Sequence, residues 1–315
     1  MHSPKILVYR PDQVEYYKEL IEKHGVSNVY TASTLEEAEK HLPNTEVILC
    51  WHFPLDLLKT SEASSVRWIQ SMGAGVDDLV NHPSISNDIQ ITRIVGQFGT
   101  PISEFVFGYM LYLTNDIART REQQAKHQWT PFNARLLSGR KIGVAGLGNI
   151  GLEIVRKARA FDMEVYGLSM SGAKADHVDR HFGPDHWKAF VKELDYLVLT
   201  LPLTEDTRWA VNREVLLSMK PDATLINVGR GALVNESDLI EILQEGHLGA
   251  AVLDVFEKEP LPEQHPFWSM PNVLVTPHLS GPSTPEGVGE FFVQNLQRYI
   301  EGKSLQGVVR REFGY

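Results

Sequence analysis

Short hydrophobic runs alternate with longer amphipathic stretches along this chain, which is the pattern of strands followed by helices. The first hundred residues contain four such runs, at residues 5–9, 28–30, 46–51 and 66–71. Amphipathic stretches at residues 13–24 and 35–41 predict helices, and Thr34 is placed to cap the second of them. Strands that alternate with helices predict a parallel sheet, so this part is expected to form a small α/β domain.

A second series of hydrophobic runs predicts another parallel sheet. Its strands are expected at residues 141–145, 164–168, 196–201, 224–228, 249–254 and 273–276. Between the two series, residues 102–121 predict one long helix that joins the domains, followed by a polar loop at 122–138. We therefore expect an α/β fold of two doubly wound parallel-sheet domains, Rossmann-like and flavodoxin-like, with a cleft between them beside the joining helix.

Composition and charge narrow the class of protein. The chain has 315 residues, more than one ordinary core organises, and its 43% hydrophobic content is that of a globular enzyme. A formal charge of −10 argues against a nucleic-acid partner. The single cysteine, Cys50, lies in an apolar run and is expected to be a core residue. The first residues enter a strand directly and no apolar run could span a membrane, so we expect a cytoplasmic protein.

The stretch KIGVAGLGNIGLEIV, residues 141–155, predicts a dinucleotide site. A strand runs into Gly146, Gly148 and Gly151 at the spacing G-x-G-x-x-G, and a helix follows. The first glycine permits the turn, the second lets the backbone approach a pyrophosphate, and the third lets helix and strand pack. The alternative is a plain strand-to-helix turn, but the order of strand, glycines and helix favours the dinucleotide.

The end of the second strand of this domain bears on the choice between NAD and NADP. An acidic residue that binds the ribose hydroxyls is usual there in NAD-specific domains, and this chain has Ser169. Without that carboxylate a 2′-phosphate is not repelled, and Ser169, Ser171 or Lys174 could bind it. NADP(H) is therefore the preferred cofactor. The alternative is a surface turn with relaxed cofactor choice, which leaves NAD(H) possible.

Three motifs follow the last three strands and carry candidate chemistry. Arg230 lies in INVGRGALV, acids lie in LDVFEKEPLP, and His278 lies in VTPHLSG. An arginine can hold a substrate carboxylate bidentately, and a histidine can donate a proton to a carbonyl near neutral pH. A carboxylate bonded to the imidazole would raise its pKa, and we assign Glu259 to that role, with Glu257 as the competitor.

A glycine-rich loop after the fourth strand is a candidate substrate site, because ligands bind at the carboxyl ends of parallel strands. The amides that could hold a carboxylate are those of Ala74, Gly75 and Val76. Candidate walls for a small substrate are Trp51, Phe53, Met72 and Trp268. The alternative for the loop is a simple turn, and at least two of the four walls are expected to be ordinary packing residues.

Each candidate catalytic residue also has an ordinary structural interpretation. Taken singly, Arg230 could be a salt-bridge residue, His278 a satisfied structural group and Glu259 a solvated turn residue; their ordered occurrence behind the glycine pattern favours catalysis. The remaining histidines considered lie in predicted helices or polar loops without metal-ligand spacing, and no metal site is expected. They are His24, His41, His82, His177, His181, His186 and His247.

Taken together, these motifs resemble the D-isomer-specific 2-hydroxyacid dehydrogenases. They occur in the family's order: GAGVD at 73–77, GLGNIG at 146–151, LPLTEDT at 201–207, INVGRGALV at 226–234, LDVFEKEPLP at 253–262 and TPHLSG at 276–281. The resemblance implies a substrate-binding domain of residues 1–99 and 285–315, an inserted dinucleotide domain of residues 100–284, and a homodimer built on the latter. It also implies that Arg230, Glu259 and His278 are catalytic.

The resemblance implies further cofactor contacts as well. The residues concerned are Thr100, Asn149, Ile150, Leu201, Pro202, Thr207, Val228, Gly229, Asp254, Ser280 and Gly281. Within the family the chain is most similar to the glyoxylate/hydroxypyruvate reductase A branch, and Glu259 in place of a glutamine speaks against formate as substrate. The expected reaction is reduction of small 2-keto acids; the alternatives are action on larger 2-keto acids, or a nucleotide sensor on the same fold.

Overall fold

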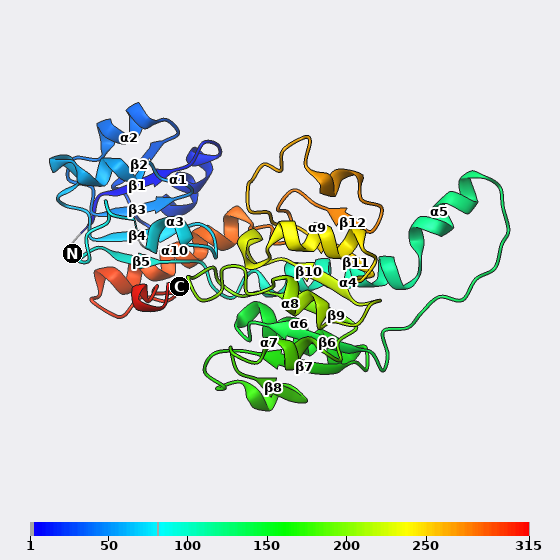
Figure 1. Cartoon of the computed structure of the whole chain (residues 1–315). Coiled ribbons are helices and arrows are strands. Elements are labelled where there is room, and N and C mark those ends of the chain that lie inside the picture. The colour runs from blue at the N-terminus through cyan, green and yellow to red at the C-terminus, as the bar shows by residue number, and fades with distance from the viewer. Residues whose placement is uncertain (1–2, 81, 315) are drawn as a thin grey trace. The chain divides into compact units, whose positions relative to one another are not determined.

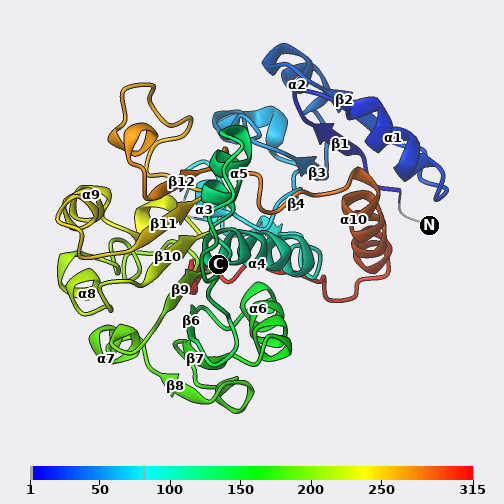
Figure 2. The same cartoon turned by 90° about the vertical axis from the view of Figure 1, so that its right-hand side faces the viewer.

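The computed structural model describes residues 3–80 and 82–314, and the chain divides into two compact units (Figures 1 and 2). One unit contains the chain up to Gln97 and from Ser283 onward, and the other contains Phe98–Pro282. Both are built on parallel sheets flanked by helices, so the α/β class expected from the sequence is confirmed. The substrate-binding and dinucleotide-binding roles assigned to the two parts stay predictions.

The first unit is organised around a five-stranded parallel sheet, counted over the described residues, with the strand order β2-β1-β3-β4-β5. Its strands are β1 (Ile6–Tyr9), β2 (Val29–Ala32), β3 (Val47–Cys50), β4 (Trp68–Ser71) and β5 (Gln90–Thr92). Its helices are α1 (Val14–Glu22), α2 (Leu35–His41), α3 (Asp77–Val80) and α10 (Pro285–Ile300), with 3₁₀ turns η1 (Leu55–Lys59), η2 (Ser61–Ala63) and η6 (Arg311–Phe313). This is the flavodoxin-like strand order.

The C-terminal segment completes this unit. The ring of Trp68 in β4 stacks on Phe292 of α10, with ring centroids 5.3 Å apart. Beyond α10 the chain runs antiparallel to β5, and the amide of Val309 donates to the carbonyl of Ile91 at 2.9 Å. The buried Asn295 of α10 fixes the return, since its Nδ2 donates to the carbonyl of Gln306 at 2.9 Å.

The second unit is organised around a seven-stranded parallel sheet, again counted over the described residues, with the order β12-β11-β10-β9-β6-β7-β8. Its strands are β6 (Lys141–Ala145), β7 (Glu164–Leu168), β8 (Arg180–Phe182), β9 (Tyr196–Leu199), β10 (Thr224–Asn227), β11 (Ala250–Leu253) and β12 (Val273–Val275). The strand order reverses at β6, so ligands are expected to bind at the carboxyl ends of β6 and β9.

Helices flank this sheet, and Figure 2 shows α4 beside α6. The helices are α4 (Gly99–Thr114), α5 (Ile117–Ala125), α6 (Asn149–Ala160), α7 (Trp187–Val191), α8 (Arg213–Leu217) and α9 (Glu236–Gln244). The 3₁₀ turns are η3 (Ala175–His177), η4 (Gly231–Leu233) and η5 (Pro266–Ser269).

The expectation of one helix over residues 102–121 is wrong, because the structure has two. Helix α4 ends at Thr114, and Asp116 adopts the left-handed conformation with φ 47°. The side chain of Asp116 then caps α5 by accepting from the amide of Arg119 at 3.3 Å. Asparagine and aspartate tolerate the left-handed region and favour helix N-caps, which is why the break falls here.

Two smaller expectations concern the interior and the membrane. Cys50 is buried, as the sequence predicts, and burial raises the pKa of its thiol to about 12. In the part of the chain that the structure describes, no helix is both long and apolar enough to cross a membrane.

Candidate active site

The three catalytic candidates lie on loops that leave neighbouring strands. Arg230 follows β10, Glu259 lies on the loop after β11, and His278 follows β12. Because these strands are adjacent and parallel, their carboxyl ends meet at one edge of the sheet. Gly231 brings two of the loops into contact, since a Cβ added there would lie 1.8 Å from the carbonyl carbon of Phe256. Any larger residue would push the arginine loop away from the glutamate loop.

His278 and Glu259 form a hydrogen-bonded pair. Nδ1 of His278 lies 2.8 Å from Oε2 of Glu259, and the other carboxylate oxygen accepts from the amide of Phe256 at 2.9 Å. The bond to Glu259 raises the pKa of His278 above its ordinary value, against the opposing effect of burial. Burial alone would raise the pKa of Glu259, but the bonds from His278 and Phe256 outweigh it and lower that pKa. The pair therefore favours an imidazolium beside a carboxylate.

Arg230 lies close enough to the pair to act on both members. Its positive charge lowers the pKa of Glu259 and opposes the rise in the pKa of His278. The backbone around it is fixed by Asn227, whose Nδ2 donates to the carbonyl of Arg230 at 2.9 Å and whose Oδ1 accepts from the amide of Gly229 at 3.1 Å. The guanidinium also donates through Nη1 to the carbonyl of Gly229 at 2.7 Å.

Asp254 holds the histidine loop in place, a role that the sequence did not reveal. Its side chain is completely buried, and it accepts from Oγ1 of Thr276 at 2.6 Å. It also accepts from the amides of Leu279 and Ser280, both at 2.9 Å, while its own carbonyl accepts from the amide of His278 at 2.9 Å. These bonds bracket His278, which has the left-handed φ of 51°. A cofactor contact by Asp254 stays a prediction.

The glycine loop has the geometry that dinucleotide binding requires. Gly146 has φ 104°, and a Cβ there would lie 2.7 Å from Oγ1 of Thr200. A Cβ on Gly151 would lie 1.8 Å from the carbonyl oxygen of Gly146, so only glycine lets α6 start this close to β6. At Gly148 an added Cβ would meet no described atom within 4 Å other than those of the residues next to it in the chain, which leaves open space beside the N-terminus of α6. These three positions fit a pyrophosphate on the helix N-terminus.

Most of the other candidate cofactor residues lie just beyond the carboxyl ends of strands in the same sheet. Thr207 stabilises the turn after β9, where its Oγ1 donates to the carbonyl of Pro202 at 2.7 Å. Thr100 lies in the first turn of α4, where its carbonyl accepts from Nζ of Lys157 at 3.4 Å. Asn149 and Ile150 begin helix α6, and the remainder lie in the loops after β9, β10 and β12, namely Leu201, Val228, Gly229, Ser280 and Gly281.

Ser169 has a neighbour that the sequence did not predict. Its Oγ lies 2.8 Å from Nε2 of His181, a residue assigned above to a predicted helix or polar loop. That assignment is wrong, because His181 lies in β8, paired with Gly167 of β7. A strand of three residues carrying Arg180 and His181 shows no hydrophobic run, so only sheet pairing reveals it. Ser171 and Lys174 lie on the exposed loop that follows Ser169.

The substrate candidates belong mostly to the first unit. Trp51 lies against the glycine-rich loop, since a Cβ on Gly73 would lie 2.9 Å from its ring. Phe53 and Met72 are 5% and 0% exposed, so the packing alternative holds for these two candidate walls. Trp268 belongs to the second unit and is 55% exposed. Ala74, Gly75 and Val76 follow Gly73 on the same loop. Over the described residues, no group of three or more His, Cys, Asp or Glu side chains could hold a metal ion.

Comparison with known proteins matches this arrangement to one family. The family model described as the NAD-binding domain of D-isomer-specific 2-hydroxyacid dehydrogenases matches residues 107–280. The chain is 29% identical over 273 residues to a glyoxylate/hydroxypyruvate reductase A from Serratia proteamaculans, covering 85% of this chain and 87% of that protein.

Solved structures give the same family. A D-isomer-specific 2-hydroxyacid dehydrogenase from Xanthobacter autotrophicus, solved with NADPH and MES, is 29% identical with a TM-score of 0.91 and covers 100% of both chains. An NADPH-dependent glyoxylate/hydroxypyruvate reductase from Sinorhizobium meliloti, solved with NADP and sulfate, is 28% identical with a TM-score of 0.89, covering 99% of this chain and all of that one.

Proposed function

This chain belongs to the D-isomer-specific 2-hydroxyacid dehydrogenases and is an oxidoreductase, and from that premise we propose that it reduces small 2-keto acids to D-2-hydroxy acids with NADPH. Glyoxylate and hydroxypyruvate are the proposed substrates. The observation that carries the proposal is the His278–Glu259 bond of 2.8 Å, with the charge of Arg230 acting on both residues. A proton donor and a carboxylate-binding cation are the two groups that this reaction needs from the protein.

The proposed chemistry divides between these residues. The reduced nicotinamide, when bound, supplies the hydride that the carbonyl carbon receives. Nδ1 of His278 is engaged by Glu259, so Nε2 is the atom that gives its proton to the carbonyl oxygen. Arg230 binds the carboxylate of the keto acid through its guanidinium and so fixes the carbonyl relative to the imidazole. Glu259 keeps the imidazole protonated and oriented before each turnover.

Two kinds of observation support NADP(H) as the preferred cofactor, with NAD(H) still usable. The relatives from Xanthobacter autotrophicus and Sinorhizobium meliloti were solved with NADPH and NADP. Ser169 provides a hydroxyl where an NAD-specific domain has a carboxylate. Gly146, Gly148 and Gly151 leave the space that the pyrophosphate of either dinucleotide needs. We propose that the unit of residues 98–282 binds the dinucleotide.

We propose that the first unit binds the substrate. The loop that contains Ala74, Gly75 and Val76 presents backbone amides at the carboxyl end of β4, and such amides suit a carboxylate. Trp51 packs over the start of that loop and is 39% exposed. A tryptophan beside the loop leaves little room for a bulky side chain, which favours small keto acids. We also propose a cytoplasmic location, since the one cysteine is a buried free thiol.

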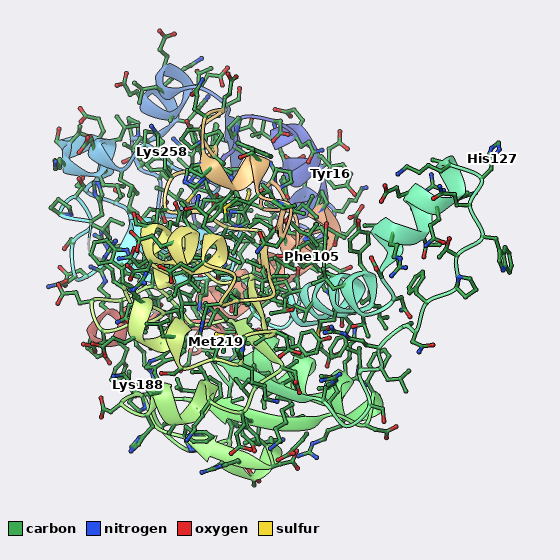
Figure 3. All side chains as sticks on the ribbon, turned by 45° about the vertical axis from the view of Figure 1, so that its right-hand side comes forward. Tyr16, Phe105, His127, Lys188, Met219 and Lys258 are labelled. Atoms are coloured by element: carbon green, nitrogen blue, oxygen red, sulfur yellow. The ribbon has the colours of Figure 1, made fainter. Side chains whose placement is uncertain are left out.

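We propose that the enzyme is a homodimer formed through the second unit. Residues 116–136, called the arm below, comprise α5 and the loop after it, and α5 buries none of its residues. Trp129 of the arm is 95% exposed and Leu136 is 73% exposed. Figure 3 shows the arm leaving the body of this unit, with His127 near its tip. A short helix without buried residues is not stable by itself, so the arm needs a partner.

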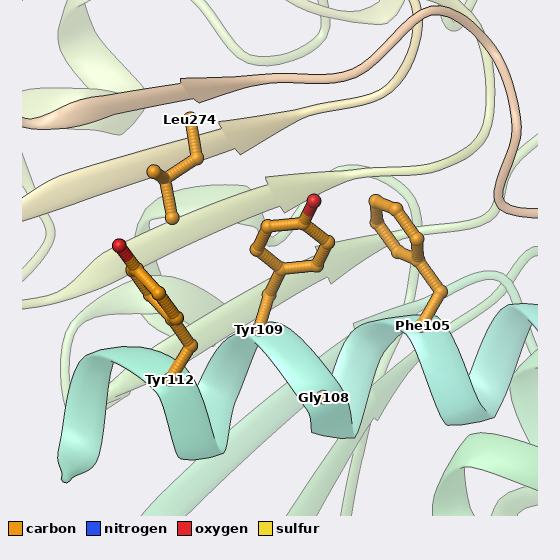
Figure 4. Close-up of a pocket in the computed structure, with 5 residues that line it drawn as sticks. All are labelled: Phe105, Gly108, Tyr109, Tyr112 and Leu274. Atoms are coloured by element: carbon orange, nitrogen blue, oxygen red, sulfur yellow. The ribbon is translucent and has the colours of Figure 1, made fainter. Parts of the chain in front are cut away.

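A groove on the same unit matches the arm in chemistry. Phe105, Tyr109 and Tyr112 project from one face of α4 toward Leu274 of β12 (Figure 4). With Gly108 they line a groove of about 420 Å³. A second copy of this chain is the proposed occupant, because its arm offers the apolar side chains that an aromatic groove binds. In a dimer with a twofold axis, the arm of each copy would occupy the groove of the other copy.

The test of the proposed reaction is steady-state kinetics on the full-length protein. NADPH and NADH are each crossed with glyoxylate, hydroxypyruvate and phenylpyruvate, and loss of nicotinamide absorbance is followed. We expect His278→Ala to lose about a hundredfold or more in kcat, and Arg230→Ala to lose mainly in KM for the keto acid. Glu257→Gln serves as the matched control. Equal rates in all variants would refute the catalytic assignment, and faster turnover of phenylpyruvate than of glyoxylate would refute the substrate size.

A further inference from the structure

Ser169 and His181 form a fixed pair at the carboxyl end of two strands. Ser169 is the first residue after β7, and its amide donates to the carbonyl of Phe182 in β8 at 3.1 Å. Its Oγ lies 2.8 Å from Nε2 of His181. Both side chains are half-buried. The start of the loop after β7 is therefore tied to β8 by its backbone and by a side chain.

The side chain of His181 lies on the same face of the sheet as the glycine loop. His181 pairs with Gly167 across the two parallel strands, and paired residues project to one face. A Cβ on Gly167 would lie 2.9 Å from Cδ1 of Leu147. Leu147 is part of the loop of residues 146–151, at which a pyrophosphate is expected. The imidazole is thus one strand away from that loop, on the dinucleotide side.

The neighbouring arginine faces the other way. Successive side chains of a strand point to opposite faces, and Arg180 lies over the ring of Phe182 with its Cζ 4.9 Å from the centroid. Its Nη1 pairs with Glu193 at 3.5 Å. The positive charge that β8 can offer on the dinucleotide side is therefore that of a protonated His181. Lys174, exposed on the loop after Ser169, can add a second charge.

We propose that His181, acting through Ser169, selects the 2′-phosphate of NADPH and makes NADPH binding depend on a proton. The proposal rests on the proposed function, since it concerns the cofactor of that reaction. His181 is a positioning residue in this scheme, and Ser169 contacts the phosphate. NADH has no phosphate at this position, so its binding does not involve the pair.

The hydrogen bond explains the dependence on a proton. When Nε2 of His181 carries a hydrogen it donates to Oγ of Ser169, and the hydroxyl hydrogen is then free to bond a phosphate oxygen. The imidazolium carries a hydrogen on both ring nitrogens, so it always donates to Oγ, and its charge adds a favourable interaction with the phosphate. The neutral imidazole carries one hydrogen, and in its Nδ1–H tautomer the hydroxyl donates to Nε2 instead, so that an oxygen lone pair faces the phosphate.

Other titratable groups surround the pair and must be separated from it. In η3, Oδ1 of Asp176 lies 4.0 Å from Nε2 of His177, so these two side chains can pair with each other. The carboxylate of Asp179 is engaged by the amide of Val165 at 2.7 Å and by Arg159 at 3.2 Å. Asp185 and His186 follow β8. The bound phosphate also titrates, but it gains charge as pH rises, which strengthens its binding to cations. A loss of affinity with rising pH therefore points to the protein.

The test is calorimetric binding of 2′,5′-ADP to the full-length protein, with 5′-AMP as the ligand that lacks the 2′-phosphate. Between about pH 6 and about pH 8 we expect the affinity for 2′,5′-ADP to fall about tenfold, while that for 5′-AMP is unchanged. His181→Gln should remove this dependence, and His181→Lys should keep tight binding at both pH values. His177→Gln, the matched control, should behave as the wild type. KM for NADPH should follow the same pattern.

Two results would overturn the inference. One is equal affinity for the two nucleotides in the wild type, and the other is an unaltered pH dependence in His181→Gln. Because binding is measured without a keto acid, the inference and the proposed reaction fail separately. If no keto acid is reduced but His181 still controls binding of 2′,5′-ADP, the inference stands and the proposed reaction fails.

Discussion

His278 and Glu259 meet across two loops, with Nδ1 of the imidazole 2.8 Å from Oε2 of the carboxylate. This bond raises the pKa of His278, so the protonated form persists to higher pH. The proposed reduction needs that form, and its rate should fall as pH rises through the raised pKa of His278. In Glu259→Gln the pKa of His278 should drop, so the decline of the rate with pH should begin at lower pH. We expect kcat/KM near neutrality to be reduced about tenfold or more. The pH–rate profile measures this.

The control for that experiment is Glu257→Gln. Glu257 is two residues away, and its Oε1 accepts from Nε1 of Trp209 at 2.8 Å. Its substitution should leave unchanged the pH at which the rate declines. An identical shift in the two variants would mean that general loss of negative charge, and not the bond to His278, sets the pH dependence.

Asp254 should matter for both stability and activity. The carboxylate of Asp254 accepts hydrogen bonds from Thr276, Leu279 and Ser280. In Asp254→Asn one of its oxygens becomes an NH₂ group, which cannot accept from these donors. A buried donor left without an acceptor costs about 1–3 kcal/mol, so we expect a lower free energy of unfolding and a less ordered His278 loop. The free energy of unfolding, measured with urea, and kcat should both be lower than in the wild type. Wild-type kcat in a variant with reduced stability would show that the loop does not depend on this carboxylate.

Gly231→Ala tests the contact between the arginine and glutamate loops. The new Cβ would lie 1.8 Å from the carbonyl carbon of Phe256, so the backbone must move at a cost of about 3 kcal/mol. We expect a lower Tm and a raised KM for the keto acid, because Arg230 moves with the loop. Gly183→Ala is the control, since its Cβ would make an ordinary contact of 3.5 Å with His186. Equal Tm values for the two variants would contradict the packing argument.

Ser169→Asp should change cofactor choice. A carboxylate at the end of β7 can bond the ribose hydroxyls of NADH and repels the 2′-phosphate of NADPH. We expect kcat/KM for NADPH to fall about tenfold or more relative to that for NADH. Parallel initial-rate measurements with the two cofactors provide the ratio, and Ser171→Asp tests whether the position matters. A ratio unchanged from the wild type would remove Ser169 from the cofactor site.

The oligomeric state should respond to the arm and to the groove. Trp129→Ser and Tyr109→Glu remove the two proposed partners, one 95% exposed on the arm and the other lining the groove. Light scattering after gel filtration should show a dimer for the wild type and monomers for both variants. Leu35→Ser, which alters an exposed side chain in the other unit, should remain a dimer. A monomeric wild type would refute the proposed homodimer.

Local patterns in the sequence were enough for much of the fold. Apolar runs bounded by turns predicted most of the strands, and their alternation with helices predicted parallel sheets, since periodicity is a property of neighbouring residues. Gly146, Gly148 and Gly151 were recognised from their spacing between a predicted strand and a predicted helix. Arg230 and His278 could be assigned to one edge of a sheet because parallel strands place their carboxyl ends together.

Contacts between distant residues decided the rest. Strand β8 has three residues and no apolar run, so His181 could be placed beside Ser169 only by pairing with β7. The break between α4 and α5 depends on one left-handed residue, Asp116. The hydrogen bonds on both sides of His278 depend on Asp254, whose burial no sequence pattern reveals. The sequence by itself determined most of the elements and the candidate residues for the chemistry; tertiary packing decided the remaining elements and which side chains meet, because hydrogen bonds and close contacts join residues that sequence spacing does not relate.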